Sequence, residues 1–131
     1  MKMKKAHTAE LTLLAGELPA LIQKIELDMD AVTIRMAGLK DAGLVYASEH
    51  WRKDHEGEPR YFYLIYPQKQ GEQRRREYVG CDQQKIDQAR AGIARAKEYD
   101  ELNCSLAKLS RCAQRASNSL REARSFLCAK H

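Results

Sequence analysis

The sequence has 131 residues, of which 44% are hydrophobic, and it carries a formal net charge of +5 at pH 7. This length fits one domain with a modest core, and the hydrophobic content excludes an intrinsically disordered chain. No segment approaches the roughly 18 consecutive apolar residues that a membrane helix needs. Glu10 and Glu17 interrupt the apolar segment that follows the basic N-terminus, so a signal peptide is not expected. We predict a soluble, cytoplasmic protein with no membrane partner.

The first predicted element is a helix over residues 18–39. Pro19 suits the first turn of a helix, where the N–H that proline lacks has no partner, and Gly38 and Gly43 are typical stop signals. Apolar residues recur at alternating intervals of four and three, the spacing of a heptad seam. Its members are Leu18, Ile22, Ile25, Met29, Val32, Met36 and Leu39. Residues 8–17 are compatible with a short additional helix before the proline.

Residues 44–80 change to a β-period and predict a three-stranded antiparallel meander. The strands are expected over residues 44–51, 61–66 and 74–79, joined by short loops. The middle strand is rich in aromatic and β-branched residues, which favour strands. Alternation places Phe62, Leu64 and Tyr66 on one face, and we expect this face to pack on a helix.

A long helix is predicted over residues 83–129, with Asp82 as its N-cap. The heptad spacing is sustained through its second half, and basic side chains lie off the seam. The seam is formed by Leu102, Leu106, Leu109, Ala113, Ala116, Leu120, Ala123 and Leu127. The apolar pattern loses phase just before this seam. The helix therefore either breaks within residues 99–105 and folds into an intramolecular bundle, or continues and pairs with a second copy as a homodimer, which we favour.

Together these elements predict an α+β fold in a single domain, residues 1–131. The N-terminal helix and the long C-terminal helix form an antiparallel coiled-coil-like hairpin, and the β-meander lies between them in the chain.

The best candidate site is basic and aromatic. Guanidinium groups form paired hydrogen bonds to phosphates, and tyrosines stack on bases or sugars. The candidate nucleic-acid-binding residues on the predicted sheet are Arg52, Lys53, Arg60, Tyr61, Tyr63, Arg74, Arg75 and Arg76. Neighbouring carboxylates nearly neutralise this patch, so the alternative is a sheet of packed tyrosines and solvated arginines.

Residues 60–66, a glycine-containing turn, residues 74–80 and the helix that follows resemble the three-stranded sheet of tyrosine-recombinase integrases from mobile elements. The resemblance covers residues 58–102 and extends to small proteins of phages and conjugative elements. In the integrases the sheet lies in the major groove of DNA, which implies DNA contacts for Arg60, Tyr63, Arg74 and Arg76. No recombinase catalytic domain follows, so strand exchange is not expected.

Catalysis and cofactor binding are not predicted. His50, Asp54 and His55 do not have the spacing of a metal site, and no carboxylate pair lies in an apolar setting that would tune a general acid. The cysteines show no Cys-x-x-Cys pair, and we expect free thiols that are buried or half-buried. They are Cys81, Cys104, Cys112 and Cys128.

The sequence therefore favours a small nucleic-acid-binding accessory protein of a phage or other mobile element, with DNA preferred over RNA. The alternative is an inhibitor or adaptor that binds a host protein complex through exposed aromatic and helical surfaces. The acidic loop over residues 54–58 suits that alternative better than DNA binding. A dimeric scaffold with no other ligand is the third hypothesis.

Overall fold

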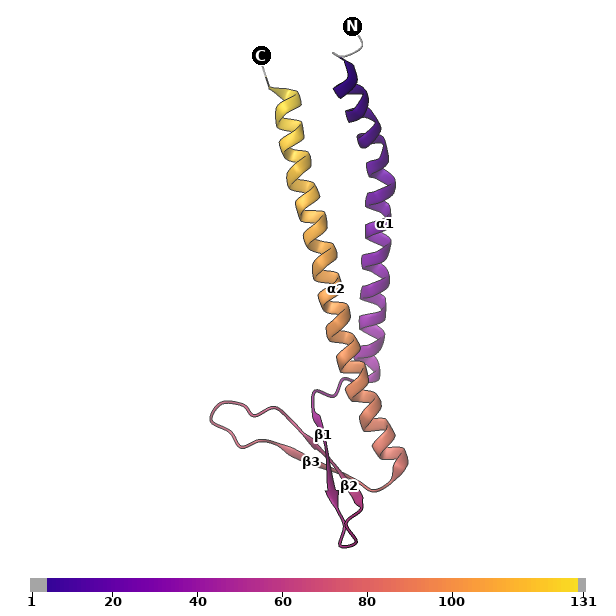
Figure 1. The fold of residues 1–131 in the computed structure, drawn as a ribbon, viewed down its shortest axis with the longest axis vertical. Helices are drawn as coiled ribbons and strands as arrows, with labels where there is room; N and C mark the ends of the chain where they lie inside the picture. Colours follow the sequence, from indigo (N-terminus) through magenta and orange to yellow (C-terminus); the bar gives the residue numbers. More distant parts are fainter. Residues whose placement is uncertain (1–4, 130–131) are drawn as a thin grey trace. The chain divides into compact units, whose positions relative to one another are not determined.

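The computed structural model describes residues 5–129, which form two helices and three strands (Figure 1). In chain order these elements are α1 (Ala6–Ala42), β1 (Ser48–Lys53), β2 (Pro59–Ile65), β3 (Arg76–Gly80) and α2 (Gln83–Cys128). The predicted α+β class is confirmed, with a three-stranded sheet between an N-terminal helix and a long C-terminal helix.

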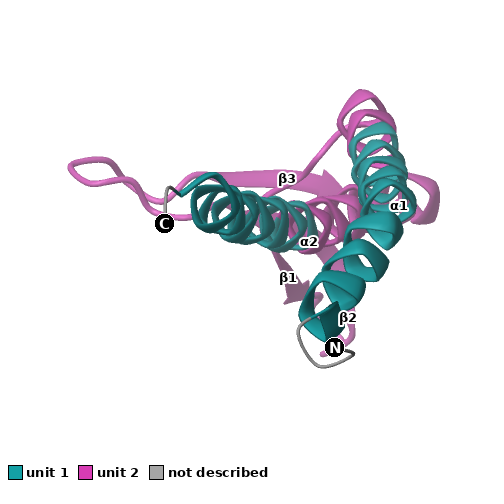
Figure 2. Ribbon diagram, turned by 90° about the horizontal axis from the view of Figure 1, so that it is seen from above, with its two compact units in different colours: residues 1–34, 104–131 teal, residues 35–103 magenta. Residues whose placement is uncertain are grey.

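The chain divides into two compact units (Figure 2). We call the first the helical arm; its described residues are 5–34 of α1 and 104–129, which include the second half of α2. The second, the sheet unit, spans residues 35–103 and contains the sheet, the end of α1 and the beginning of α2. The single domain predicted over residues 1–131 stays a prediction.

Helix α1 begins at Ala6 rather than at Leu18, so Pro19 lies inside it. The prediction that Pro19 occupies the first turn is therefore wrong. Residues 6–18 are rich in alanine, leucine and glutamate, which are strong helix formers. Their propensity extends the helix past a proline that removes one backbone hydrogen bond. Gly43 ends the helix with a positive φ of 109°, and its N–H donates to the carbonyls of Leu39 and Lys40.

Helix α2 is continuous from Gln83 to Cys128 and does not break within residues 99–105. Asp82 caps it as predicted, because its side-chain Oδ1 accepts a hydrogen bond of 3.2 Å from the N–H of Gln84. The phase change in the apolar pattern is therefore accommodated within a single helix, and the broken-helix alternative is wrong.

The sheet is an antiparallel meander in the order β1-β2-β3. Its first strand begins at Ser48, although residues 44–51 were predicted as strand. The preceding segment instead bonds to α2: the N–H of Val45 donates to the carbonyl of Gly92 at 3.1 Å. A backbone bonded to a helix in this way is not free to join the sheet, which explains the later start of β1.

The core of the sheet unit lies between one face of β2 and α2. Phe62, Leu64 and Ile86 are all but inaccessible to solvent, and Val45, Ala47, Tyr66, Val79, Ala89 and Ile93 pack around them. The predicted burial of the Phe62 and Leu64 face against a helix is confirmed. This packing fixes which side of the sheet faces away from α2.

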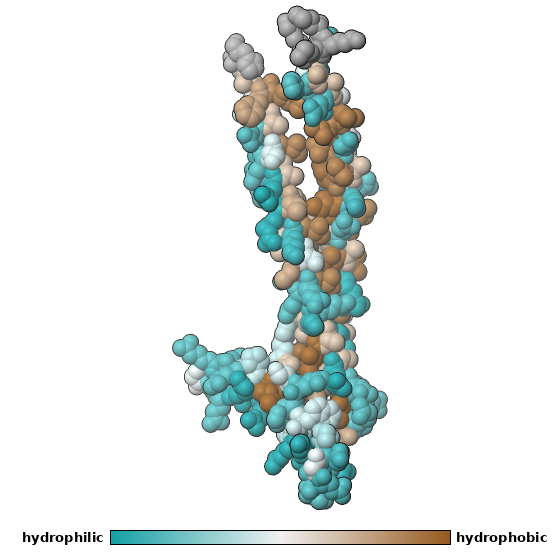
Figure 3. Space-filling view, in the orientation of Figure 1, coloured by the Kyte–Doolittle hydropathy of each residue, from teal (hydrophilic) through white to brown (hydrophobic). Residues whose placement is uncertain are grey.

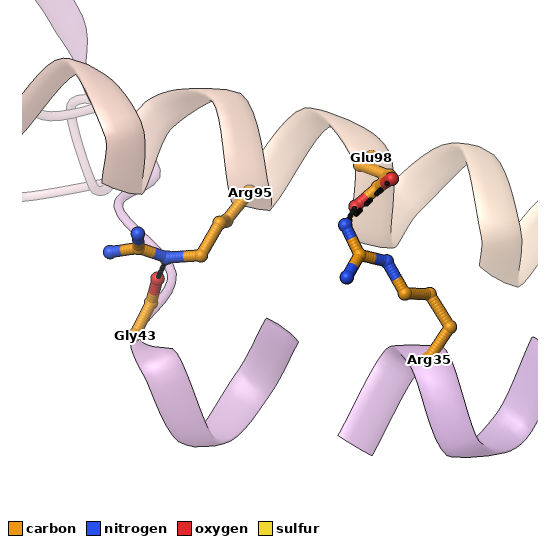
Figure 4. Close-up of polar contacts among 4 residues, drawn as sticks. All are labelled: Arg35, Gly43, Arg95 and Glu98. Atoms are coloured by element: carbon orange, nitrogen blue, oxygen red, sulfur yellow. Dashed lines mark hydrogen bonds and ion pairs between the residues drawn. The ribbon is translucent and has the colours of Figure 1, made fainter. Parts of the chain in front are cut away.

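The end of α1 is attached to α2 within the sheet unit by polar contacts (Figure 4). The Nε of half-buried Arg95 donates to the carbonyl of Gly43 at 2.7 Å, so it satisfies a carbonyl at the helix end. The guanidinium of Arg35 pairs with the carboxylate of Glu98 at 2.8 Å. Both partners of this pair are exposed, so its contribution to stability is small.

Gly92 permits the close approach of residues 43–47 to α2. A Cβ atom at this position would lie 2.5 Å from Cγ2 of Val45, whereas a Cβ at Gly38 would meet nothing within 4 Å. We expect Gly92→Ala to lower the free energy of unfolding by about 1–2 kcal/mol, because overpacking outweighs the gain in helix propensity. Urea unfolding measures this effect.

The matched control is Gly38→Ala, which we expect to stabilise the protein by about 0.5–1 kcal/mol. The double variant Val45→Ala/Gly92→Ala should be at least as stable as Gly92→Ala alone, because the shorter side chain removes the clash. Equal stability changes for Gly38→Ala and Gly92→Ala would contradict this account.

Candidate functional site

Strand alternation separates the side chains of the sheet into two sets. Residues that pair across neighbouring strands share a face of the sheet. Three such pairs lie on the side away from Phe62: His50–Tyr63, Arg52–Tyr61 and Tyr63–Tyr78. We call this side, which faces away from α2, the outer face. Its members are Ser48, His50, Arg52, Tyr61, Tyr63, Ile65, Arg76 and Tyr78.

The centre of the outer face is a cluster of aromatic rings. The rings of Tyr63 and Tyr78 lie 4.9 Å apart between centroids, tilted by 47°, and Tyr61 lies 6.5 Å from Tyr78. The ring of His50 meets Tyr63 edge-on at 6.3 Å. Tyr78 is 54% exposed, so one ring of the cluster presents a large surface to solvent.

Cationic side chains flank this cluster. Arg52 and Arg76 line a shallow pocket together with His50 and Tyr63. A second pocket extends along the same side to Lys53 at the β-bulge. Neither the guanidinium of Arg52 nor that of Arg76 forms an ion pair within residues 5–129. These charges are therefore available to an anionic ligand.

The carboxylates of the strands lie on the opposite side. Glu49 and Glu77 both pair in register with Leu64, which is buried against α2. Glu49 forms an ion pair of 2.7 Å with Arg90 of α2, and Glu77 accepts a hydrogen bond from the hydroxyl of Tyr66 at 2.9 Å. The sequence indicated that neighbouring carboxylates nearly neutralise this patch. In the structure the strand carboxylates lie on the other side of the sheet, so the outer face contains no acidic strand residue.

One carboxylate does reach the edge of the outer face. Asp54 lines the same pocket as Lys53, in the turn between β1 and β2. Its Oδ1 accepts hydrogen bonds from the backbone N–H groups of Glu56 and Glu58, at 2.9 and 3.0 Å. Asp54 therefore has a structural role in the turn.

The hydroxyl of Tyr78 on the outer face remains protonated at neutral pH. Partial desolvation raises the pKa of Tyr78 above its ordinary value, and the neighbouring Cys81 and Tyr63 raise it further. A protonated hydroxyl can donate a hydrogen bond to a phosphate oxygen as well as accept one.

The structure brings together only part of the predicted site. Arg52, Tyr61, Tyr63 and Arg76 share the outer face, and Lys53 lines its pocket. Arg60 lies near enough to Tyr78 to influence its hydroxyl electrostatically.

Arg75 and Arg74 do not join the outer face. The guanidinium of Arg75 lies 4.6 Å from the centre of the Tyr66 ring, and its Nη2 is 3.9 Å from Glu77. This arginine is thus engaged on the side of the sheet that carries the carboxylates. Arg74 is exposed in the loop that precedes β3.

Sequence reasoning missed His50 and Tyr78 as members of the outer face. The signal for Tyr78 was its position two residues after Arg76, because strand residues separated by two share a face. The place of His50 follows from the register between β1 and β2, which the sequence does not specify.

Metal binding and the state of the cysteines were the other features considered for a site in the described part of the chain. No group of three or more histidine, cysteine or acidic residues there could hold a metal ion. All four cysteines are exposed, so the expectation that they are buried or half-buried is wrong. Their positions on α2 lie off the seam or at its solvent-exposed end, except for Cys81, which follows β3.

Comparison with protein-family models, curated proteins and solved structures found no match to this chain. Within residues 5–129, neither helix combines the length and the apolar character that crossing a membrane requires.

The hydrogen bond between Tyr66 and Glu77 predicts a loss of stability at high pH. Burial of Tyr66, and then this hydrogen bond, raise the pKa of the hydroxyl above 10.0. Folding therefore favours the protonated form, so its contribution is complete below pH 10 and disappears as the pH rises through the higher value of the folded state. Tyr66→Phe should reduce the fall in unfolding free energy above pH 10, as measured by urea unfolding across that range. An unchanged pH dependence would contradict this assignment.

Proposed function

We propose that the outer face of the sheet binds nucleic acid, with DNA as the preferred ligand. In this proposal Arg52 and Arg76 contact phosphates, and Tyr61, Tyr63 and Tyr78 contact sugars or bases. The sequence resemblance to the recombinase sheet supports DNA, and the accessory role in a phage or mobile element rests on that resemblance.

The observation that carries the proposal is the separation of charge across the sheet. Two unpaired guanidinium groups and an aromatic cluster share the outer face, whereas Glu49 and Glu77 are engaged on the other side. A face that contacts only solvent does not require its cationic and acidic side chains to lie on opposite sides of the sheet. Aromatic rings beside cations are the combination that binds nucleic acids through stacking and phosphate contacts.

The number of cations limits the strength of the interaction. Arg52, Arg76, Lys53 and Arg60 are the basic groups on or beside the outer face. Neutralising two to four phosphates predicts a slope of about −2 to −4 for the logarithm of the binding constant against that of salt concentration on duplex DNA. We therefore expect moderate affinity and limited sequence preference.

A paired set of double variants tests the proposal. We expect Arg52→Ala/Arg76→Ala to weaken binding by about tenfold or more, because two charge-assisted contacts are lost. The matched control Arg74→Ala/Arg75→Ala removes the same charge from the neighbouring positions, and we expect about threefold weakening or less from its long-range effect. Fluorescence anisotropy with labelled single- and double-stranded DNA at two salt concentrations provides the measurement.

Circular dichroism establishes that both double variants are folded. Equal affinities for the wild type and Arg52→Ala/Arg76→Ala, or equal losses in the two double variants, would contradict the proposal. Wild-type protein that binds neither form of DNA would also overturn it.

Tyr78 tests the aromatic contribution separately. If its exposed ring stacks on a base, Tyr78→Ala should weaken binding to single-stranded DNA by about 5- to 100-fold, since stacking contributes about 1–3 kcal/mol per base. Tyr78→Phe keeps the ring and should remain close to the wild type. Equal binding by the alanine and phenylalanine variants would show that the ring does not stack.

A further inference from the structure

The helical arm has no buried core among its described residues. Every residue over 5–34 and 104–129 is exposed or half-buried, including those of the predicted heptad seams. Large apolar side chains are widely accessible: Leu13 is 66% exposed, Ile34 72% and Leu127 68%. Figure 3 shows hydrophobic residues along both helices of the arm and open space between them. Two helices packed only on each other thus leave most of their apolar surface in water.

A groove of about 750 Å³ runs between the two helices of the arm. Its floor is apolar because the helices face each other through their seams. The seam of α2 contributes two alanines there, which are too short to fill the space between the backbones. The apolar floor consists of Leu18, Leu21, Ile22, Ile25, Ala113, Ala116 and Leu120.

Helix α1 is also apolar on the side away from this groove. Leu13, Leu27 and Ile34 are separated by multiples of seven residues, so they form one row along the helix. At about 100° per residue, this row lies about 120–180° around the helix from the seam residues Leu18 and Ile25. A helix that is apolar on opposite sides requires neighbours on both sides, and α2 of the same chain covers only one.

The charges of the arm are divided between its helices. Residues 5–34, which include α1 as far as Ile34, have five carboxylates against two lysines; the carboxylates are Glu10, Glu17, Glu26, Asp28 and Asp30. Over residues 104–129, α2 has one carboxylate, Glu122, against five cations; these are Lys108, Arg111, Arg115, Arg121 and Arg124.

These opposite charges are not paired between the helices within the part of the arm that the structure describes. No ion pair joins the two helices among the described residues of the arm. Arg121 and Arg124 instead line the groove, as the cations beside its apolar floor. An apolar helix with flanking carboxylates would fit this groove, and α1 of a second copy is such a helix.

From this apolar, charge-divided surface we infer that the helical arm is the interface for a second copy of this chain, and that α1 of each copy occupies the groove of the other. Two copies related by a two-fold axis make the same contacts with each other, so the assembly stops at the dimer. The result is an antiparallel four-helix assembly in which each α1 contacts α2, the partner's α1 and the partner's α2. The inference concerns the arm alone and does not depend on the proposed function of the sheet.

The mass in solution is the first test. Sedimentation equilibrium of the wild type at micromolar concentration should give twice the chain mass of 15.0 kDa. Leu21→Glu places a charge in the groove and should give the single-chain mass, with helicity retained in circular dichroism. Gln23→Glu makes the same change in charge at an exposed position of α1 that does not line the groove, and it should remain dimeric. A monomeric wild type, a higher oligomer, or a dimeric Leu21→Glu would overturn the inference.

A second pair of variants tests the same dimer interface if Leu21→Glu fails to fold. Arg121→Glu/Arg124→Glu reverses the charges at the groove and should raise the dimer dissociation constant by about tenfold or more. Arg111→Glu/Arg115→Glu makes the same change on the same helix, outside the groove, and should have a smaller effect. Equal effects of the two double variants would contradict the placement of the partner's α1.

Cys112 reports occupancy of the groove in the unmodified protein. It lines the groove, whereas Cys81, which is also exposed, lies in the sheet unit, and Cys104 does not line the groove. Alkylation of Cys112 should slow as protein concentration rises, while Cys81 and Cys104 react at constant rates. A concentration-independent rate at Cys112 would show that the groove is open in the assembled protein and would overturn the inference.

Discussion

The packing of Phe62 and Leu64 on Ile86 is the interaction on which the sheet depends. Successive strand residues point to opposite sides, so burial of these two residues fixes the side of every other residue in β2 and, through the register, in β1 and β3. A shift of one residue would turn the tyrosines toward α2 and expose the core. The candidate site is therefore a consequence of hydrophobic packing on the other side of the sheet.

The composition of the middle strand was enough to predict the two faces of β2, but not the site. Membership of the outer face depends on register, and β-bulges at Arg52/Lys53 and Phe62/Tyr63 shift it. Arg75 and Arg76 are adjacent in sequence and were predicted to act together, yet Arg75 lies on Tyr66. Likewise, residues 44–47 have the composition of a strand, but a hydrogen bond to Gly92 of α2 holds their backbone. Local residue propensities do not predict contacts of this kind between residues that are distant in the sequence.

The helices show a different limit of prediction. Heptad spacing predicted the seams, of which Leu18, Ile22 and Ile25 on α1 and Ala113, Ala116 and Leu120 on α2 line the groove of the arm. Asp82 and Gly43 act as the caps that their residue types suggest. The spacing does not predict whether a helix of the same chain or of a second copy covers the seam. In the sheet unit Met36 and Leu39 are buried, whereas in the arm every seam residue remains accessible. The surplus apolar surface and the opposite charges of α1 and α2 are what point to a second copy.

The two proposals make separate use of one chain, because the sheet provides a charged aromatic face and the arm provides an apolar one. The central claim is that the outer face of the sheet is the ligand surface, and NMR titration with a short DNA tests it most directly. Trp51 pairs with Phe62 on the side of the sheet that faces α2, where their ring centroids lie 4.9 Å apart. We predict that the signals of His50, Tyr61, Tyr63 and Tyr78 shift together on addition of DNA, while those of Trp51 and of the helical arm change little. Shifts confined to the arm or to the opposite side of the sheet, or no shifts at all, would contradict the account.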